Sequence, residues 1–207
     1  MLRNYLNLIF LFGPGLALSG GGVSGSAPEP RAVAAPAGPF GLYAYGGGIG
    51  GAQVFYSHDV AFIGDQTKMN DDEAALVVFT TGPNNELVGN PDTASSRGVP
   101  TWSNKAFFVP KATSSSRRVG FTSRASEPDA DADTSGFVFY GATALHEDAD
   151  HALHGLWSVV PVSAAEEGEA EKRIWALLWN VTDADGARVS VTLRSTPPAT
   201  PFDLPEA

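Results

Sequence analysis

Ten short runs rich in Val, Phe, Tyr, Trp and Thr constrain the fold of this 207-residue chain more than any other feature. Gly, Pro, Asn and Asp bound these runs, as is typical of β-strands. In one run, Trp175, Leu177 and Trp179 alternate with their neighbours, which puts them on one face of a strand. The runs do not alternate with helical segments, which argues against a parallel α/β sheet. The pattern therefore predicts an all-β fold, an antiparallel β-sandwich or partly closed barrel of about ten short strands. The runs cover residues 40–46, 52–57, 59–65, 74–81, 105–110, 117–123, 136–144, 153–162, 173–182 and 187–195.

The first residues have the pattern of a secretory signal peptide. Arg3 precedes an apolar run, and the small residues Ala17 and Ser19 stand just before Gly20. We therefore expect a secreted, extracellular protein. No later apolar stretch approaches the ~20 residues that a membrane span needs. The predicted organisation is a signal peptide at 1–19, a flexible Gly/Pro/Ala-rich leader at 20–39, a single β domain at 40–198 and a C-terminal tail at 199–207.

Composition argues against several classes of chemistry and partner. The chain has no cysteine, which excludes thiol nucleophiles, thiolate metal sites and disulfides. A domain of this length can still be held together by core packing. The formal net charge of -10 disfavours nucleic acid as a partner, because phosphate contacts need a basic face. An anionic membrane surface is disfavoured for the same reason.

A glycine-rich stretch, YGGGIGGAQVFYSHDV at 45–60, contains a formal G-x-G-x-x-G match at Gly46, Gly48 and Gly51. A dinucleotide site needs a helix after the glycines, because the helix N-terminus binds the pyrophosphate. Here a strand pattern follows instead. We therefore predict a glycine-rich bend or bulge between strands, and no bound cofactor.

Three other segments carry loop signals. Asp185–Gly186 predicts a hairpin between the two runs that flank it. The sequence GPNNE at 82–86 predicts a turn. The acidic segment 163–173 has helical composition, but its density of acids and its glycine favour an exposed loop.

Three of the four histidines lie together in TALHEDADHALHGLW. If residues 147–150 form the tip of a hairpin, His146 and His151 face each other across its strands. Two imidazoles and a carboxylate could then bind Zn²⁺ or Cu²⁺. His154 lies an odd number of residues from His151 and points to the other face of a regular strand. The competing interpretation is a solvated acidic tip, because the spacing matches no established zinc pattern.

Two further clusters suggest chemistry less strongly. Asp129, Asp131 and Asp133 resemble the start of a calcium-binding loop, but the turn glycine and the final glutamate of that loop are missing. Ser57, His58 and Asp59 are adjacent, but neighbours on a strand point to opposite faces, so we expect a polar turn there. No catalytic residue is predicted.

Two single residues have candidate surface roles. Trp102 lies in the polar stretch GVPTWSNK and is the best candidate for an exposed aromatic contact, whereas the other tryptophans lie in apolar runs and are expected in the core. Asn180-Val181-Thr182 is the chain's one N-glycosylation sequon, so Asn180 is a predicted glycosylation site of a secreted eukaryotic protein.

The phrases GLYAYGGGIGGAQVFYSHDVAFIGD, LWSVVPV and IWALLWNVTDADG resemble uncharacterised small secreted cysteine-free proteins of filamentous fungi. The resemblance covers most of residues 40–195. It contains no catalytic motif, so it implies an extracellular location and no particular activity.

Three hypotheses for function follow. The first is a non-enzymatic β-sandwich that binds a glycan, a cell-wall component or a host protein. The second is a small secreted or biosynthetic enzyme with a cavity lined by His or carboxylates. The third is a metal-binding module at the His146/His151 hairpin.

Overall fold

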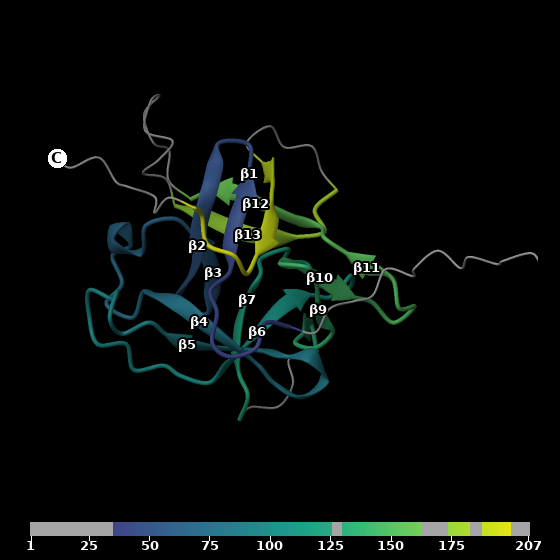
Figure 1. Cartoon of the computed structure of the whole chain (residues 1–207), viewed down its shortest axis with the longest axis horizontal. Helices are drawn as coiled ribbons and strands as arrows, with labels where there is room; N and C mark the ends of the chain where they lie inside the picture. Colours follow the sequence, from purple (N-terminus) through teal and green to yellow (C-terminus); the bar gives the residue numbers. More distant parts are fainter. Residues whose placement is uncertain (1–34, 126–129, 163–173, 183–187, 200–207) are drawn as a thin grey trace, which may run out of the picture. The chain divides into compact units, whose positions relative to one another are not determined.

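The computed structural model of this chain describes residues 35–125, 130–162, 174–182 and 188–199 (Figure 1). Within these ranges the chain is almost entirely β-structure, as the sequence predicts. The strands are β1 (Tyr43–Gly46), β2 (Ile49–Ser57), β3 (Val60–Ile63), β4 (Ala75–Thr81), β5 (Leu87–Pro91), β6 (Lys105–Pro110), β7 (Gly120–Ser123), β8 (Ala132–Asp133), β9 (Phe137–Tyr140), β10 (Thr143–Glu147), β11 (Leu153–His154), β12 (Trp157–Pro161), β13 (Trp175–Trp179), β14 (Val189–Ser190) and β15 (Thr192–Arg194). Two single-turn 3₁₀ helices, η1 (Gln66–Lys68) and η2 (Pro83–Asn85), accompany them.

Six antiparallel strands close into a barrel in the order β2-β4-β5-β6-β7-β3, and β3 returns to β2. The β2–β3 hairpin pairs Val54 with Ile63 and Ser57 with Val60. The barrel closes where Val60 of β3 pairs with Gly120 of β7. Closure removes the exposed edges that an open sheet would leave on these strands.

Outside the barrel, β8 pairs with β6, and the other strands extend from β2 and β3. On one side β1 pairs with β2, β15 with β1, and β10 with β15, β9 and β11. On the other side β13 pairs with β3, and β12 pairs with β13 and β14 (Figure 1). Only Val191 separates β14 from β15, and its N–H donates to the Trp157 carbonyl at 3.1 Å. The two outer groups of strands therefore meet at this point.

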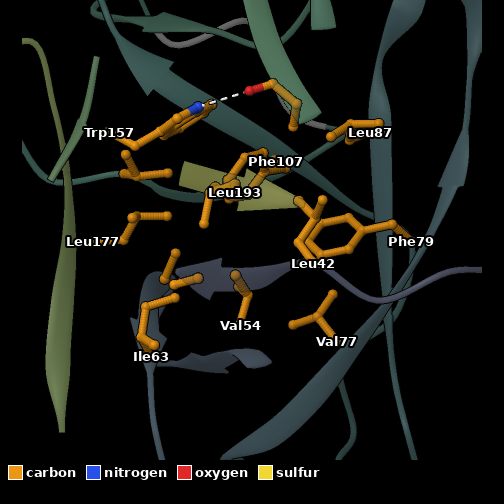
Figure 2. Close-up of a cluster of buried hydrophobic side chains, with 14 of the residues drawn as sticks. Leu42, Val54, Ile63, Val77, Phe79, Leu87, Phe107, Trp157, Leu177 and Leu193 are labelled. Carbon is orange, nitrogen blue, oxygen red and sulfur yellow. Dashed lines mark hydrogen bonds between the residues drawn. The ribbon is translucent and has the colours of Figure 1, made fainter. Parts of the chain in front are cut away.

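Alternate residues of the strands face one large apolar core (Figure 2). Phe79, Phe107 and Leu42 are fully buried there. The Trp157 indole Nε1 also lies inside and donates to the Ala144 carbonyl at 2.9 Å, so its one polar atom is satisfied. The predicted core face of β13 is confirmed, because Trp175, Leu177 and Trp179 all belong to this cluster.

The glycine-rich stretch forms the β1–β2 hairpin, which confirms the predicted bend. The pairing register shifts between Ala44 and Tyr45, as in a β-bulge. Gly48 and Gly51 have φ of 84° and 95°, conformations that favour glycine. A strand and no helix follows the glycines, so the geometry of a dinucleotide site is absent from this segment.

Two predicted strand runs divide differently in the structure. The run 136–144 is a hairpin, with β9 and β10 joined through Gly141 at φ 60°. The run 153–162 splits into β11 and β12, which pair with different neighbours. The predicted turn Asp185–Gly186 lies outside the described residues. The strands that flank it, β13 and β14, both pair with β12 and, within the described residues, not with each other, so the predicted hairpin between them is wrong.

Several predictions fall on residues that the structure does not describe: the signal peptide at 1–19, most of the leader, the acidic segment 163–173 and the tail from residue 200. The predicted turn at 82–86 is confirmed and contains η2. Within the described ranges, no helix has the length and apolar character that crossing a membrane requires.

Candidate functional site

A concavity lies on the outer face of β6 and β7, and we call it the Thr122 groove. Its volume is about 610 Å³. Phe107 and Phe121 point into the core, so their neighbours Ala106 and Thr122 point outward and form the groove floor as a cross-strand pair. The polar side chains along the groove are those of Glu86, Ser103, Asn104, Thr122, Ser123, Arg124 and Thr134.

Glu86 reaches the groove because of the turn that precedes β5. Asn84 and Asn85 have φ of 55° and 57°, a left-handed conformation that asparagine tolerates better than most residues. The Gly82 amide donates to the Glu86 carbonyl at 2.9 Å and closes the turn. The Glu86 carboxylate then accepts from Arg124 Nη2 at 3.0 Å. Both charged groups are partly exposed, so this ion pair adds little stability and leaves acceptor and donor atoms facing the groove.

Asn104 and Ser123 also line the groove. The Asn104 backbone has φ of 54°, and its N–H donates to Asn90 Oδ1 at 3.0 Å. The Ser123 hydroxyl accepts from the Ala125 N–H at 3.3 Å. These contacts hold amide and hydroxyl groups around the outward-facing Thr122.

The chemistry of the groove favours binding of a polar ligand. Typical sites for small molecules are mostly apolar, with a few polar groups. This groove instead presents hydroxyls, an amide and one carboxylate–guanidinium pair. Glu86 is the one acid among its described lining residues. A glycosidase requires two carboxylates that flank the bond it cleaves, so these residues supply only half of that machinery.

The structure places His146 in the core, away from solvent. It is 6% exposed and lies edge-to-face between Phe137 and Trp179, with ring centroids 5.5 and 5.6 Å away. Its Nε2 makes no hydrogen bond of good geometry and lies 3.4 Å from Asp133 Oδ2. This contact, reinforced by Ser135, lowers the pKa of the Asp133 carboxyl.

The predicted pairing of His146 with His151 is wrong. His146 pairs with His154, because the loop between β10 and β11 runs from 148 to 152 and is longer than the predicted tip. His151 lies in that loop with φ of 62°. Its Nδ1 contacts the Glu147 carboxylate, and this contact raises the pKa of the imidazole. His154 contacts Asp148 at 2.7 Å, and this contact lowers the pKa of the Asp148 carboxyl.

The three histidines therefore have separate partners. Among the described residues, no three His, Cys, Asp or Glu side chains are grouped so that they could hold a metal ion. Asp129 lies outside the described residues. Asp133 accepts from the Ser135 N–H and hydroxyl at 3.2 Å, and Asp131 accepts from the Lys111 amide through its backbone carbonyl at 2.8 Å.

Ser57, His58 and Asp59 form the end of the β2–β3 hairpin, which confirms the predicted polar turn. His58 and Asp59 have φ of 49° and 60°, as in a type I′ turn. The Ser57 hydroxyl donates to Asp71 Oδ2 at 2.6 Å, and His58 Nδ1 lies 3.0 Å from Ser57 Oγ and 3.2 Å from Asp71 Oδ2.

This geometry differs from that of a catalytic triad. In a triad the serine and the aspartate contact opposite nitrogens of the imidazole. Here both contact the same nitrogen of His58, and Ser57 is fully buried. The hydroxyl of Ser57 therefore has no access to a substrate.

The expectation that Trp102 is exposed is wrong. Trp102 is 8% exposed and stacks on Tyr56 with a centroid distance of 4.3 Å. Its indole N–H donates to the Glu73 carbonyl at 2.9 Å. The polar stretch around it had suggested exposure, but the ring packs on Tyr56 and Phe121 within the core cluster. Burial, together with the Asp59 hydrogen bond, raises the pKa of Tyr56 to about 12.

Comparisons with known proteins give no further assignment: a scan against protein-family models and searches of curated proteins and of solved structures found no match to this chain. The Thr122 groove was not predicted from the sequence. Its residues come from β6, β7, β8 and the loops beside them, with Glu86 just before β5, and form no local motif. The pairing of β5, β7 and β8 with β6 brings them together.

Proposed function

We propose that this chain is a secreted, non-enzymatic β-barrel module that binds a carbohydrate in the Thr122 groove. The observation that carries the proposal is the groove lining, in which hydroxyl, amide and charged groups surround a floor of one threonine and one alanine. Sugar hydroxyls both donate and accept hydrogen bonds, and this lining offers both functions. The acidic net charge and the predicted signal peptide favour an extracellular glycan over nucleic acid.

Two features support binding rather than turnover. The groove contains one carboxylate among its described lining residues, and that carboxylate is paired with Arg124. The cluster of Ser57, His58 and Asp71 lies at the hairpin end and has the wrong geometry for a relay.

Thermal unfolding tests the proposal with hexasaccharides of β-1,4-glucose, β-1,3-glucose, β-1,4-N-acetylglucosamine and β-1,4-xylose as probes. A saccharide that binds only the folded state stabilises it by about 2.7 kcal/mol at a hundredfold excess over Kd, which raises the melting midpoint. Thr122→Val removes one hydroxyl from the groove floor at nearly constant volume. We expect this substitution to raise the Kd of the saccharide roughly 2- to 10-fold, because one hydrogen bond is lost.

Thr80→Val is the matched control. Thr80 is half-buried like Thr122 and faces outward from β4 next to the core residue Phe79, but it does not line the groove. A saccharide that stabilises wild type and Thr80→Val equally, and Thr122→Val less, supports the proposal. Equal stabilisation of all three proteins would show that the saccharide binds outside the groove. If none of the four probes shifts the melting midpoint, carbohydrate binding is contradicted. Release of smaller sugars during incubation would contradict the non-enzymatic part.

A further inference from the structure

A second groove, distinct from the Thr122 groove, is lined in part by Asn180 and Val181, the first two residues of the sequon. We call it the Asn180 groove. It has a volume of about 490 Å³ and lies where the end of β1, the start of β12 and the β14–β15 junction meet. Its polar lining includes Tyr45, Ser158, Asn180, Arg188, Ser190 and Thr192.

The backbone of Asn180 is held firmly at the groove wall. Asn180 directly follows β13, has φ of 48°, and its N–H donates to the Leu156 carbonyl at 3.0 Å. The next residue, Val181, accepts from Arg188 Nη1. Asn180 itself is half-buried, so a group attached to its side chain starts inside the groove rather than on an open surface.

Ser158 provides an independent sign of a ligand. It lines the groove, is 3% exposed, and its hydroxyl has no hydrogen-bond partner among the described residues. A buried hydroxyl in a folded protein ordinarily has such a partner. A polar group seated in the groove would supply one.

We propose that Asn180 carries an N-linked glycan and that the first sugar of this glycan occupies the Asn180 groove. The hydroxyl and acetamide groups of N-acetylglucosamine can donate to and accept from Ser158 and its neighbours Ser190 and Thr192. The inference rests on the secretion proposed above, because attachment takes place in the secretory pathway.

The attachment step is a substitution at the anomeric carbon of a lipid-diphosphate-linked oligosaccharide. A bond forms between Asn180 Nδ2 and that carbon. The carbon–oxygen bond to the lipid diphosphate breaks, the diphosphate leaves with the electron pair, and Asn180 Nδ2 loses one proton. The groove of the folded protein then holds the first sugar against the β12–β14 surface.

The first experiment tests occupancy of the sequon. The full chain is expressed in a eukaryotic secretory host, and the mass of the secreted protein is measured before and after denaturation and treatment with peptide N-glycosidase. Wild type and Thr182→Ser, which keeps the sequon, should both lose mass. Asn180→Gln should not. Secreted wild-type protein without a glycan would overturn the inference.

The second experiment tests whether the sugar is seated. Ser190 is exposed and lines the groove, so Ser190→Trp fills it, whereas Ser190→Ala leaves it open. Under native conditions we expect the glycan of Ser190→Trp to be released about tenfold faster than that of wild type and of Ser190→Ala, because a seated sugar must first leave the groove. Equal release rates in all three proteins would overturn the seated position.

These outcomes are separable from those of the proposed function. A chain that the host does not export contradicts both the proposed location and this inference. A chain exported without a glycan contradicts only this inference. Saccharide binding in the Thr122 groove is measured with different variants, so its failure leaves the glycan result intact.

Discussion

At the residue scale, the contact between Asp133 and the buried His146 makes the stability of the fold depend on pH in the acid range. The imidazole beside Asp133, together with hydrogen bonds from Ser135, lowers the pKa of that carboxyl below its ordinary value. A carboxyl with a lowered pKa in the folded state stabilises the protein above the unfolded-state pKa, and this stabilisation is lost as pH falls toward the folded-state value.

We therefore predict that Asp133→Asn loses stability at pH 5 to 7 but is less sensitive than wild type to acid below about pH 4. Melting midpoints measured between pH 7 and pH 2 test this prediction. Asp72→Asn, at an exposed carboxyl, is the control and should follow the wild-type profile. If Asp133→Asn follows the wild-type profile down to pH 2, the contact does not stabilise the fold.

Single residues were the hardest part to predict from sequence. The tryptophans of β13 were placed correctly because their alternation is local. Trp102 was misplaced because its burial depends on Tyr56 and Glu73, which lie far away in the sequence. His146 is buried for a similar reason, since its neighbours Phe137 and Trp179 come from two other strands.

At the element scale, the β2–β3 hairpin depends on two left-handed residues. His58 has φ of 49°, is directly followed by Asp59 at 60°, and its side chain is largely exposed. Left-handed backbone costs an L-residue roughly 1–2 kcal/mol, and a β-branched side chain suffers most. Asparagine is among the residues that tolerate this conformation best.

We predict that His58→Val destabilises the protein by about 1–2 kcal/mol relative to His58→Asn. Both variants remove the imidazole and its contact with Asp71, so their difference isolates the backbone effect. Urea unfolding at one pH measures it. Equal midpoints with equal m-values would show that the left-handed turn conformation does not affect the free energy of unfolding.

The strands were predictable from sequence to the extent that their patterns are local. The run 105–110 coincides with β6, and the run 74–81 nearly coincides with β4. The pairing partners were not predictable in the same way. The two-residue strands β11 and β14 carry too little pattern to identify. The register at His146 was misassigned because the loop spans 148–152 instead of the predicted 147–150.

At the scale of the whole molecule, the barrel closes through a close approach at Gly120. A Cβ atom at this position would lie 2.4 Å from the Asp59 carbonyl oxygen. That same oxygen accepts from the Phe121 N–H at 2.9 Å, next to the pairing of Val60 with Gly120. Only a residue without a side chain lets β3 and β7 approach this closely.

We predict that Gly120→Ala costs about 1–3 kcal/mol, the usual cost of overpacking, and speeds amide exchange at Phe121. Gly50→Ala is the control, because a Cβ there meets nothing within 4 Å. Denaturant unfolding and hydrogen exchange measure both effects. Full protection of the Phe121 amide in a stable Gly120→Ala variant would contradict closure of the barrel through this pair.

The pairing of β5, β7 and β8 with β6 also explains why the Thr122 groove could not be predicted. Glu86 precedes β5, Thr122 lies in β7, and Thr134 follows β8, and no spacing in the sequence links them. Composition argued only against one class of partner, because the negative net charge of the chain disfavours binding of nucleic acid.

The most direct test of the proposed function is an NMR titration of the full, ¹⁵N-labelled chain with the hexasaccharide that most stabilises it. Binding in the groove predicts saturable shifts of the Thr122, Ser123 and Arg124 amides, with little change at the Ser57–Asp59 hairpin end. Shifts confined to other surfaces, or no saturable shift at millimolar saccharide, where a Kd of 1 mM corresponds to about -4.1 kcal/mol, would contradict carbohydrate binding at this groove.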